Sequence, residues 1–264
     1  MQVPLMRRTV GENIGLCFSV AMGSIGRLLA ISALFSLPSL VLGLVVANLQ
    51  SGGAGDREAL ELAAMVGLFT LPLALVCGPI QQVASVLIVA ESFTGQKRYL
   101  GECFSVALSR FFPVLILSMM WGLIITIGAF LLIIPGLIFL VWYSVSAVAL
   151  VLEDLSATDS LSRSKELTAG RRWEVFALVL VFFGLSFVIG VGAATVSVLF
   201  VEQDSILSAT IEWVVGLFVG CIFSVFPVVL YFDLRTDKDA LDLDQVEDLV
   251  QRIGRQHDSP GESA

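Results

Sequence analysis

The sequence predicts an all-α polytopic membrane protein with six transmembrane helices, arranged as three hairpins that each follow a cytoplasmic interfacial helix. Composition is the first indication, because 57% of the 264 residues are hydrophobic and only 14% are charged, against roughly a quarter charged in soluble domains. Long runs without charge are the second. The third is an uneven distribution of basic residues, which places nearly all of them on one side of the predicted spans.

Residues 28–47 form the first predicted span. At about 1.5 Å per residue, this charge-free run reaches roughly the 30 Å of the hydrocarbon core. A cleaved signal peptide is less consistent with the N-terminus, because Gly11, Glu12 and Asn13 interrupt the apolar segment that such a peptide needs. Further uncharged runs lie at residues 62–90, 111–152, 175–201 and 213–232.

The run over residues 111–152 decides the number of spans. As one helix it would extend over about 63 Å, twice the bilayer core, so the chain is expected to reverse within it. Pro135-Gly136 is the expected turn, because proline removes a helical donor and glycine accepts unusual backbone angles. Six spans result.

The basic residues support this number. With six spans, fourteen of the fifteen Lys and Arg residues lie on one side and Arg57 alone on the other. The positive-inside rule makes the basic side cytoplasmic, with both termini there. We expect a multi-pass protein of a bacterial inner (cytoplasmic) membrane.

A short repeat divides the chain into three units. CFSVA occurs at residues 17–21 and 103–107, each time in an amphipathic segment that precedes a span. A third segment, residues 157–170, holds the same place before the fifth span. The units cover about residues 9–92, 95–152 and 155–235 of a membrane domain, 1–235, and residues 236–264 form an acidic cytoplasmic tail with a short amphipathic helix. Coincidental identity between two interfacial helices is the alternative.

Four motifs resemble the glycerophosphodiester phosphodiesterase membrane-domain family and related six-span bacterial proteins without assigned activity. These are TVGENI at residues 9–14, IIPGLIFLVWYSVSAVALVLED at 133–154, SLSRSKELTAGRRWEVFAL at 160–178 and YFDLR at 231–235. In that family the membrane domain is sometimes joined to a phosphodiesterase domain. Too few residues follow Arg235 for such a domain, so the resemblance implies the six-span fold without an enzyme.

The residues themselves also argue against catalysis. A hydrolase needs a nucleophile with a base, or a metal held by His and carboxylates, and the single histidine, His257, lies in the polar tail. Glu153 and Asp154 are expected to end the fourth span, and the four cysteines to act as small hydrophobic residues. We predict no catalytic residues, metal site or cofactor, and no binding of nucleic acid, because the net charge is −8.

The segment CGPIQQ, residues 77–82, is the candidate site for a solute or lipid. In a ligand site of this kind, Gly78 and Pro79 would break the second helix, and Gln81 and Gln82 would offer amides to the ligand. A proline kink whose glutamines bond neighbouring helices is the favoured alternative. No ionisable residue lies in the centre of a predicted span, which argues against coupled transport.

Two further sets of residues have expected roles in contacts with lipid and between helices. The candidate contacts for anionic headgroups are Lys97, Arg98, Arg163, Lys165, Arg171 and Arg172, although signalling of topology also explains them. The small residues Gly216, Gly220 and Ser224 are expected to pack against Gly190 and Ala194 of the fifth span, with dimerisation as the competing hypothesis.

These observations predict a non-enzymatic integral membrane module, an organising or accessory protein that contacts membrane lipids and a protein partner through its cytoplasmic face or tail. The alternative is a transporter or lipid-handling protein with a cavity near residues 78–82. A polar cavity between the spans would favour the alternative, and a filled interior would favour the accessory role.

Overall fold

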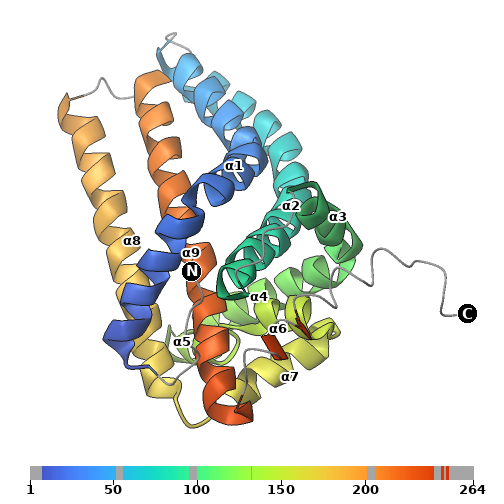
Figure 1. Ribbon diagram of the computed structural model, residues 1–264. Helices are drawn as coiled ribbons and strands as arrows, with labels where there is room; N and C mark the ends of the chain where they lie inside the picture. The colour runs from blue at the N-terminus through green and yellow to red at the C-terminus, as the bar shows by residue number, and fades with distance from the viewer. Residues whose placement is uncertain are drawn as a thin grey trace, which may run out of the picture.

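The computed structural model describes residues 8–51, 56–94, 100–131, 133–200, 206–240, 245–246 and 248–249. All regular structure within these ranges is helical (Figure 1). The helices are α1 (Val10–Ser51), α2 (Asp56–Thr94), α3 (Leu100–Ser109), α4 (Phe111–Leu131), α5 (Ile133–Trp142), α6 (Ser146–Glu153), α7 (Ala157–Thr168), α8 (Arg172–Phe200) and α9 (Ile206–Asp239).

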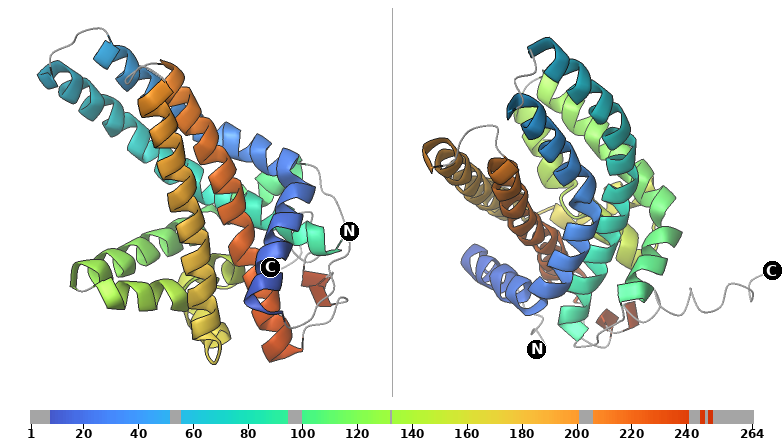
Figure 2. Two further views of the ribbon diagram at one scale, coloured as in Figure 1. Left: turned by 90° about the vertical axis from the view of Figure 1, so that its left-hand side faces the viewer. Right: turned by 90° about the horizontal axis from the view of Figure 1, so that it is seen from above.

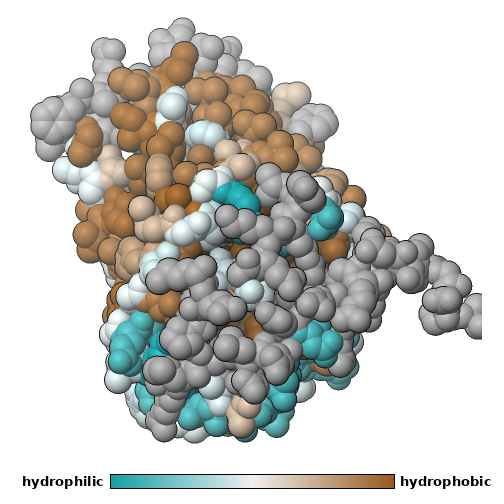
Figure 3. Space-filling view, in the orientation of Figure 1, coloured by the Kyte–Doolittle hydropathy of each residue, from teal (hydrophilic) through white to brown (hydrophobic). Residues whose placement is uncertain are grey.

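Six segments of these helices are long and apolar enough to cross a membrane, which confirms the all-α polytopic fold. They lie in α1, α2, α4, α5 with α6, α8 and α9. Figure 3 shows one face of the molecule: its upper part is largely apolar, and hydrophilic residues gather at its lower end, where α7 lies in Figure 1. The apolar side chains exposed on the spans, such as Phe187 and Leu123, would be costly in water and are expected in contact with lipid.

The three predicted interfacial helices differ from one another in the structure. The second is α3 and the third is α7, and each ends just before a span. The first is continuous with its span, because α1 runs unbroken over 42 residues, or about 63 Å at 1.5 Å per residue. Figure 1 shows α1 changing direction along its length. The expectation of a separate first helix is therefore corrected: no residue between Val10 and Ala47 interrupts the helix.

The reversal between the third and fourth spans is confirmed, but Pro135-Gly136 is not the turn itself. Both residues lie in the first turn of α5, which begins at Ile133. Proline is tolerated there because the first N–H groups of a helix have no helical partner. A Cβ atom on Gly128 of α4 would lie 3.0 Å from the Cα of Gly136, so the two glycines allow the arms of the hairpin to approach closely.

The helix of the fourth span is interrupted, and a side chain from α7, which is not part of that span, bonds to the backbone at the interruption. Residues 143–145 form a turn between α5 and α6. Ser164 of α7 donates its hydroxyl to the Trp142 carbonyl (2.8 Å) and accepts the Val145 N–H (3.3 Å). Backbone groups freed inside a membrane protein need partners of this kind. The break is therefore built into the fold.

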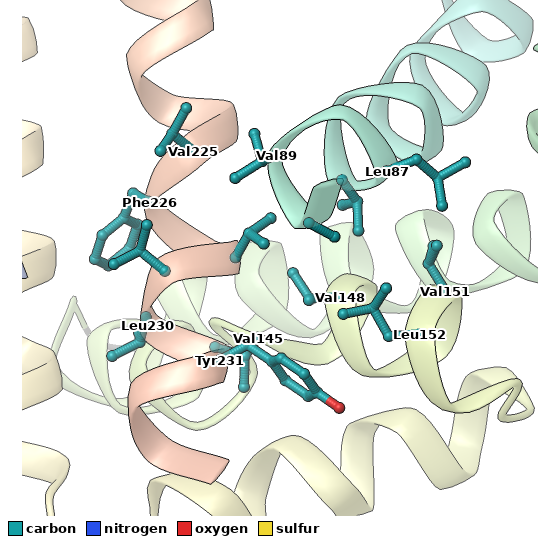
Figure 4. Packing of buried hydrophobic residues seen from close by; sticks show 14 of the residues in the cluster. Leu87, Val89, Val145, Val148, Val151, Leu152, Val225, Phe226, Leu230 and Tyr231 are labelled. Atoms are coloured by element: carbon teal, nitrogen blue, oxygen red, sulfur yellow. The ribbon is translucent and has the colours of Figure 1, made fainter. Parts of the chain in front are cut away.

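The core lies where α2, α6 and α9 meet. Figure 4 shows Val89 of α2 directed toward Val225 of α9, and Leu87 of α2 directed toward Val151 of α6, and all four side chains are buried. Elsewhere Phe93 contacts Phe232, with 4.5 Å between ring centroids. In Figure 2, left, the α4–α5 hairpin projects away from α8 and α9, and this divergence leaves room for a cavity.

Candidate functional site

A cavity of about 500 Å³ lies between the diverging hairpin and the remaining spans. Its walls come from α2, α4, α5, α6, α8 and α9. Aromatic and aliphatic side chains dominate, among them Trp121, Phe182 and Phe226. Volumes of roughly 300–1,000 Å³ with mainly apolar walls and a few polar groups are typical of sites for small molecules.

A second cavity of about 430 Å³ adjoins the first. The two share four polar lining residues, which are Gln82, Ser85, Ser118 and Ser224. The shared residues make one polar seam between two cavities, on the faces of α2, α4 and α9.

The interrupted fourth span forms one wall of the larger cavity. Tyr143 and Ser144 of the break line it, followed by Ser146, Ala147 and Val148 of α6. Irregular backbone at membrane depth is tolerated where it is buried in protein or lines a cavity. The break and the cavity are therefore parts of one feature.

Serine hydroxyls in the cavity differ in how they are bonded. Ser144, Ser146 and Ser224 each donate to a backbone carbonyl of their own segment, at 2.8–3.0 Å. Ser85 is only 2% exposed, and its hydroxyl has no hydrogen-bond partner among the described residues. Buried hydroxyls without a partner are uncommon, so Ser85 marks the place where a ligand would complete the site.

Charge is absent from this site. No Arg, Lys, Asp, Glu or His occurs among the described residues that line either cavity. An isolated charge is costly to bury without a counter-ion. The chemistry of the walls therefore suits apolar chains and uncharged polar groups.

The structure places the predicted residues of CGPIQQ beside this site. Gly78, Pro79, Gln81 and Gln82 all line the smaller cavity. The second span is not broken there: α2 continues through both Pro72 and Pro79, as the favoured alternative expected. Proline near neighbouring helices is accommodated in membrane helices without ending them; the broken span is the fourth.

The two glutamines have different environments. The amide of Gln81 donates to the Ser32 hydroxyl of α1 at 3.3 Å, as the alternative interpretation of the sequence expected. Gln82 lines both cavities and is exposed. Gln82 is thus the better placed of the two to meet a ligand.

An ion pair joins the start of each hairpin to its end, on the side of the spans where the basic residues lie. Arg27 pairs with Glu91 at 2.6 Å, Arg110 pairs with Asp154, and Arg171 pairs with Asp233 at 2.8 Å. In each pair the arginine precedes the hairpin and the acid follows it. This recurrence supports the hypothesis of three related units.

Asp233 is the most enclosed of these acids, since its side chain is 0% exposed. Its Oδ1 accepts the backbone N–H of Arg8 (3.0 Å), and its Oδ2 accepts from the Asn13 amide (3.1 Å). Arg171 also donates to Glu174 and to the carbonyl of Arg8. The start of α1, the start of α8 and the end of α9 are therefore joined at one carboxylate.

Glu153 organises a second polar group. It accepts from Arg163 (3.1 Å) and from the Tyr231 hydroxyl (2.7 Å), and Arg235 lies 3.7 Å away. Arg163 also pairs with Asp239. Burial disfavours the charged form of Arg163, but the carboxylates of Glu153 and Asp239 outweigh this effect and raise its pKa. Its charge is thus firmly held in the protein.

The predicted headgroup contacts divide into two sets. Arg163 and Arg171 are occupied by the carboxylates described above. Lys165 and Arg172 are exposed and lie over the ring of Trp142, at 4.7 and 4.9 Å from its centroid. Lys97 and Arg98 lie outside the described residues.

The expected packing of small residues is not made among the residues that the structure describes. Gly190, Ala194 and Gly216 are exposed, and a Cβ atom on Gly190, Gly216 or Gly220 would meet nothing within 4 Å. Aromatic side chains separate α8 from α9 instead: Phe182 contacts Phe226 at 4.6 Å between centroids. Ser224 lines the cavities. Large rings between the helices prevent the close backbone approach that small residues favour.

Two apolar residues of the amphipathic helix expected in the tail pack against the membrane domain of the same chain. Val246 is fully buried, and Leu249 packs against the core.

Two features of the site were not predicted from the sequence. Glu153 and Asp154 were expected only to end the fourth span, although each hairpin carries an arginine before it and an acid after it. The break at residues 143–145 was not predicted either, because the side chains YSV continue an apolar run there.

Comparison of the chain with protein-family models, curated proteins and solved structures gives no match, so the resemblance to the phosphodiesterase membrane domain rests on the four sequence motifs alone.

Proposed function

We propose that this protein is a non-enzymatic, lipid-handling membrane protein that binds a lipid in the larger cavity, which adjoins the smaller cavity beside residues 78–82 at the polar seam. The cavity is the observation that carries the proposal: a filled interior would have favoured the purely organising role, and the interior is open. Its apolar walls and polar seam match a molecule with hydrocarbon chains and a polar group. Binding and presentation of such a lipid to a partner at the cytoplasmic face unites this proposal with the accessory role.

We place the protein in a bacterial inner membrane with both termini in the cytoplasm. The distribution of basic residues supports this orientation. In a variant with Cys77 replaced by Ala, Glu61→Cys should react with an impermeant maleimide added outside the cell, and Glu102→Cys should not. Both positions are exposed and lie on opposite sides of the second span. The reverse pattern of labelling would overturn the orientation.

Lys165 and Arg172 are the proposed contacts for anionic headgroups at the cytoplasmic surface. Both are exposed, and the neighbouring Trp173 is 83% exposed. Tryptophan and basic side chains are typical of the interface. Replacing both basic residues with Gln should lower the anionic lipid retained by the purified protein, and unchanged retention would contradict the contact.

The central test blocks the cavity from within. Ser118→Trp places a large ring at the polar seam, whereas Met119→Trp adds the same ring on the 60% exposed, outward side of α4. Both variants are purified, stripped of lipid with detergent and reloaded with a phospholipid and a diacylglycerol that each carry a photoreactive acyl chain. Mass spectrometry then locates the labelled residues.

The proposal expects label on cavity residues in the parent and in Met119→Trp, and at least about tenfold less in Ser118→Trp, equivalent to about 1.4 kcal/mol of binding. If the parent carries label only on outward-facing residues, the lipid-binding function is wrong. Equal thermal stability of the two variants ensures that a loss of label reflects the cavity.

A further inference from the structure

The larger cavity is lined by a serine hydroxyl, that of Ser85, that has no hydrogen-bond partner among the described residues. Ser85 is 2% exposed. Two nearby hydroxyls bond to their own helices: Ser92, also on α2, donates to the Ile88 carbonyl at 3.4 Å, and Ser224 of α9 donates to the Cys221 carbonyl at 2.8 Å. The Ser85 hydroxyl is therefore available to an acceptor inside the cavity.

The N-terminus of α6 faces the same cavity. No side chain caps it, since its N-cap residue is Val145, and Ser146, Ala147 and Val148 line the cavity wall. The Ser146 N–H already donates to the Tyr143 carbonyl at 3.2 Å, so among the described residues the N–H groups that this end offers to a ligand are those of Ala147 and Val148. Such groups carry partial positive charge. Ser85 and this helix end together favour an oxygen acceptor on the ligand.

The walls restrict the charge of the ligand. None of the described lining residues is Lys, Arg, His, Asp or Glu, and Arg27 and Arg171 are paired with carboxylates at the basic end of the spans. A phosphate group in the cavity would lose its water without gaining a cation. The ligand's polar part is therefore uncharged, while rings such as Trp121 and Phe182 suit a hydrocarbon chain.

We infer that the cavity selects an uncharged glycerolipid of the diacylglycerol class, with an ester carbonyl or hydroxyl oxygen bonded to Ser85, over phospholipids. This inference rests on the proposed lipid-binding function and adds the class of lipid. Ester and hydroxyl oxygens are good acceptors without charge, and such a lipid brings no phosphate into the membrane interior.

The test uses the full chain in detergent, loaded with photoreactive dioleoylglycerol or photoreactive dioleoylphosphatidylglycerol that carry the same reactive acyl chain. Unlabelled lipids of both kinds compete for the cavity. We expect dioleoylglycerol to compete at least about tenfold better for labelling of cavity residues. Ser85→Ala should remove most of that preference, Ser85→Thr should keep it because the hydroxyl is retained, and Ser92→Ala, outside the cavity, serves as the matched control.

The outcomes distinguish failure of the lipid selection from failure of the proposed lipid binding. Equal or better competition by the phosphatidylglycerol would overturn the selection of an uncharged lipid and leave lipid binding standing. A preference unchanged in Ser85→Ala would overturn the role of this hydroxyl. Absence of label from the cavity with either lipid would overturn the proposed function itself. The comparison of lipids on the parent protein needs no variant, so it holds even if Ser85→Ala folds poorly.

Discussion

Asp233→Asn should destabilise the protein because it removes a buried charge on which three segments converge. The carboxylate accepts from the Arg8 N–H and the Asn13 amide, and it forms an ion pair with Arg171 at 2.8 Å. Asparagine keeps the shape of the side chain but has one acceptor oxygen and one NH₂ group. At least one of the three donors is then left facing another donor.

The size of the effect follows from these contacts. Hydrogen bonds to a charged group contribute about 1.5–3 kcal/mol, and a buried donor without a partner costs about 1–3 kcal/mol. Loss of one partner from a buried ion pair costs roughly 3–5 kcal/mol. Arg171 retains Glu174 at 2.6 Å, which limits the uncompensated charge, so we expect about 3 kcal/mol.

Buried cysteines provide the assay. Cys17, Cys103 and Cys221 are at most 2% exposed, so a thiol-reactive dye added in detergent reports unfolding during heating. Glu212→Gln is the matched control: it removes one carboxylate charge from the exposed surface of the same helix, α9. Surface substitutions of this kind usually change stability by less than about 0.5 kcal/mol.

A second variant tests the mechanism. Adding Arg171→Gln to Asp233→Asn should recover part of the stability, because no unpaired buried cation remains. If Asp233→Asn unfolds at the same temperature as Glu212→Gln, the three-way junction does not stabilise the fold.

Three further substitutions probe the hairpins. Gly128→Ala should lower stability by about 1–3 kcal/mol, because its Cβ would lie 3.0 Å from the Gly136 backbone, whereas Gly122→Ala meets nothing within 4 Å and should be tolerated in the same thermal assay. Ser164→Ala should cost about 1–3 kcal/mol by leaving backbone groups of the broken span unpaired; unchanged stability would show that water replaces the hydroxyl. Gly216→Leu should leave the monomer's melting temperature within the error of the parent, because nothing lies within 4 Å of its Cβ position, and a large drop would restore the internal packing expected from the sequence.

Much of the fold follows from the sequence because the membrane imposes strong constraints. Charge-free runs of fixed minimum length locate the spans, and the excessive length of residues 111–152 requires a reversal. The sequence does not locate that reversal to the residue, since Pro135 fits the first turn of a helix as well as a tight turn.

The site was only partly predictable, for a different reason. Residues 78–82 pointed to the smaller cavity, because Gly, Pro and Gln are unusual together in a span. The broken fourth span carries no such mark: its break depends on Ser164, which lies outside that span. The Asp233 junction likewise depends on contacts across 220 or more residues, which no local pattern records.

The hydroxyl of Ser164 also sets an order of events during biogenesis. Until α7 is made and packs, the Trp142 carbonyl and the Val145 N–H lack these partners, and an unsatisfied backbone group in hydrocarbon costs several kcal/mol. The two bonds cross only 19 and 22 residues, so α7 emerges from the ribosome soon after the span it completes. We expect a nascent chain stopped at residue 155 to be extracted from the membrane by alkali or urea more readily than one stopped at residue 172. A helix at the membrane surface is thereby required for stable integration of the span that precedes it.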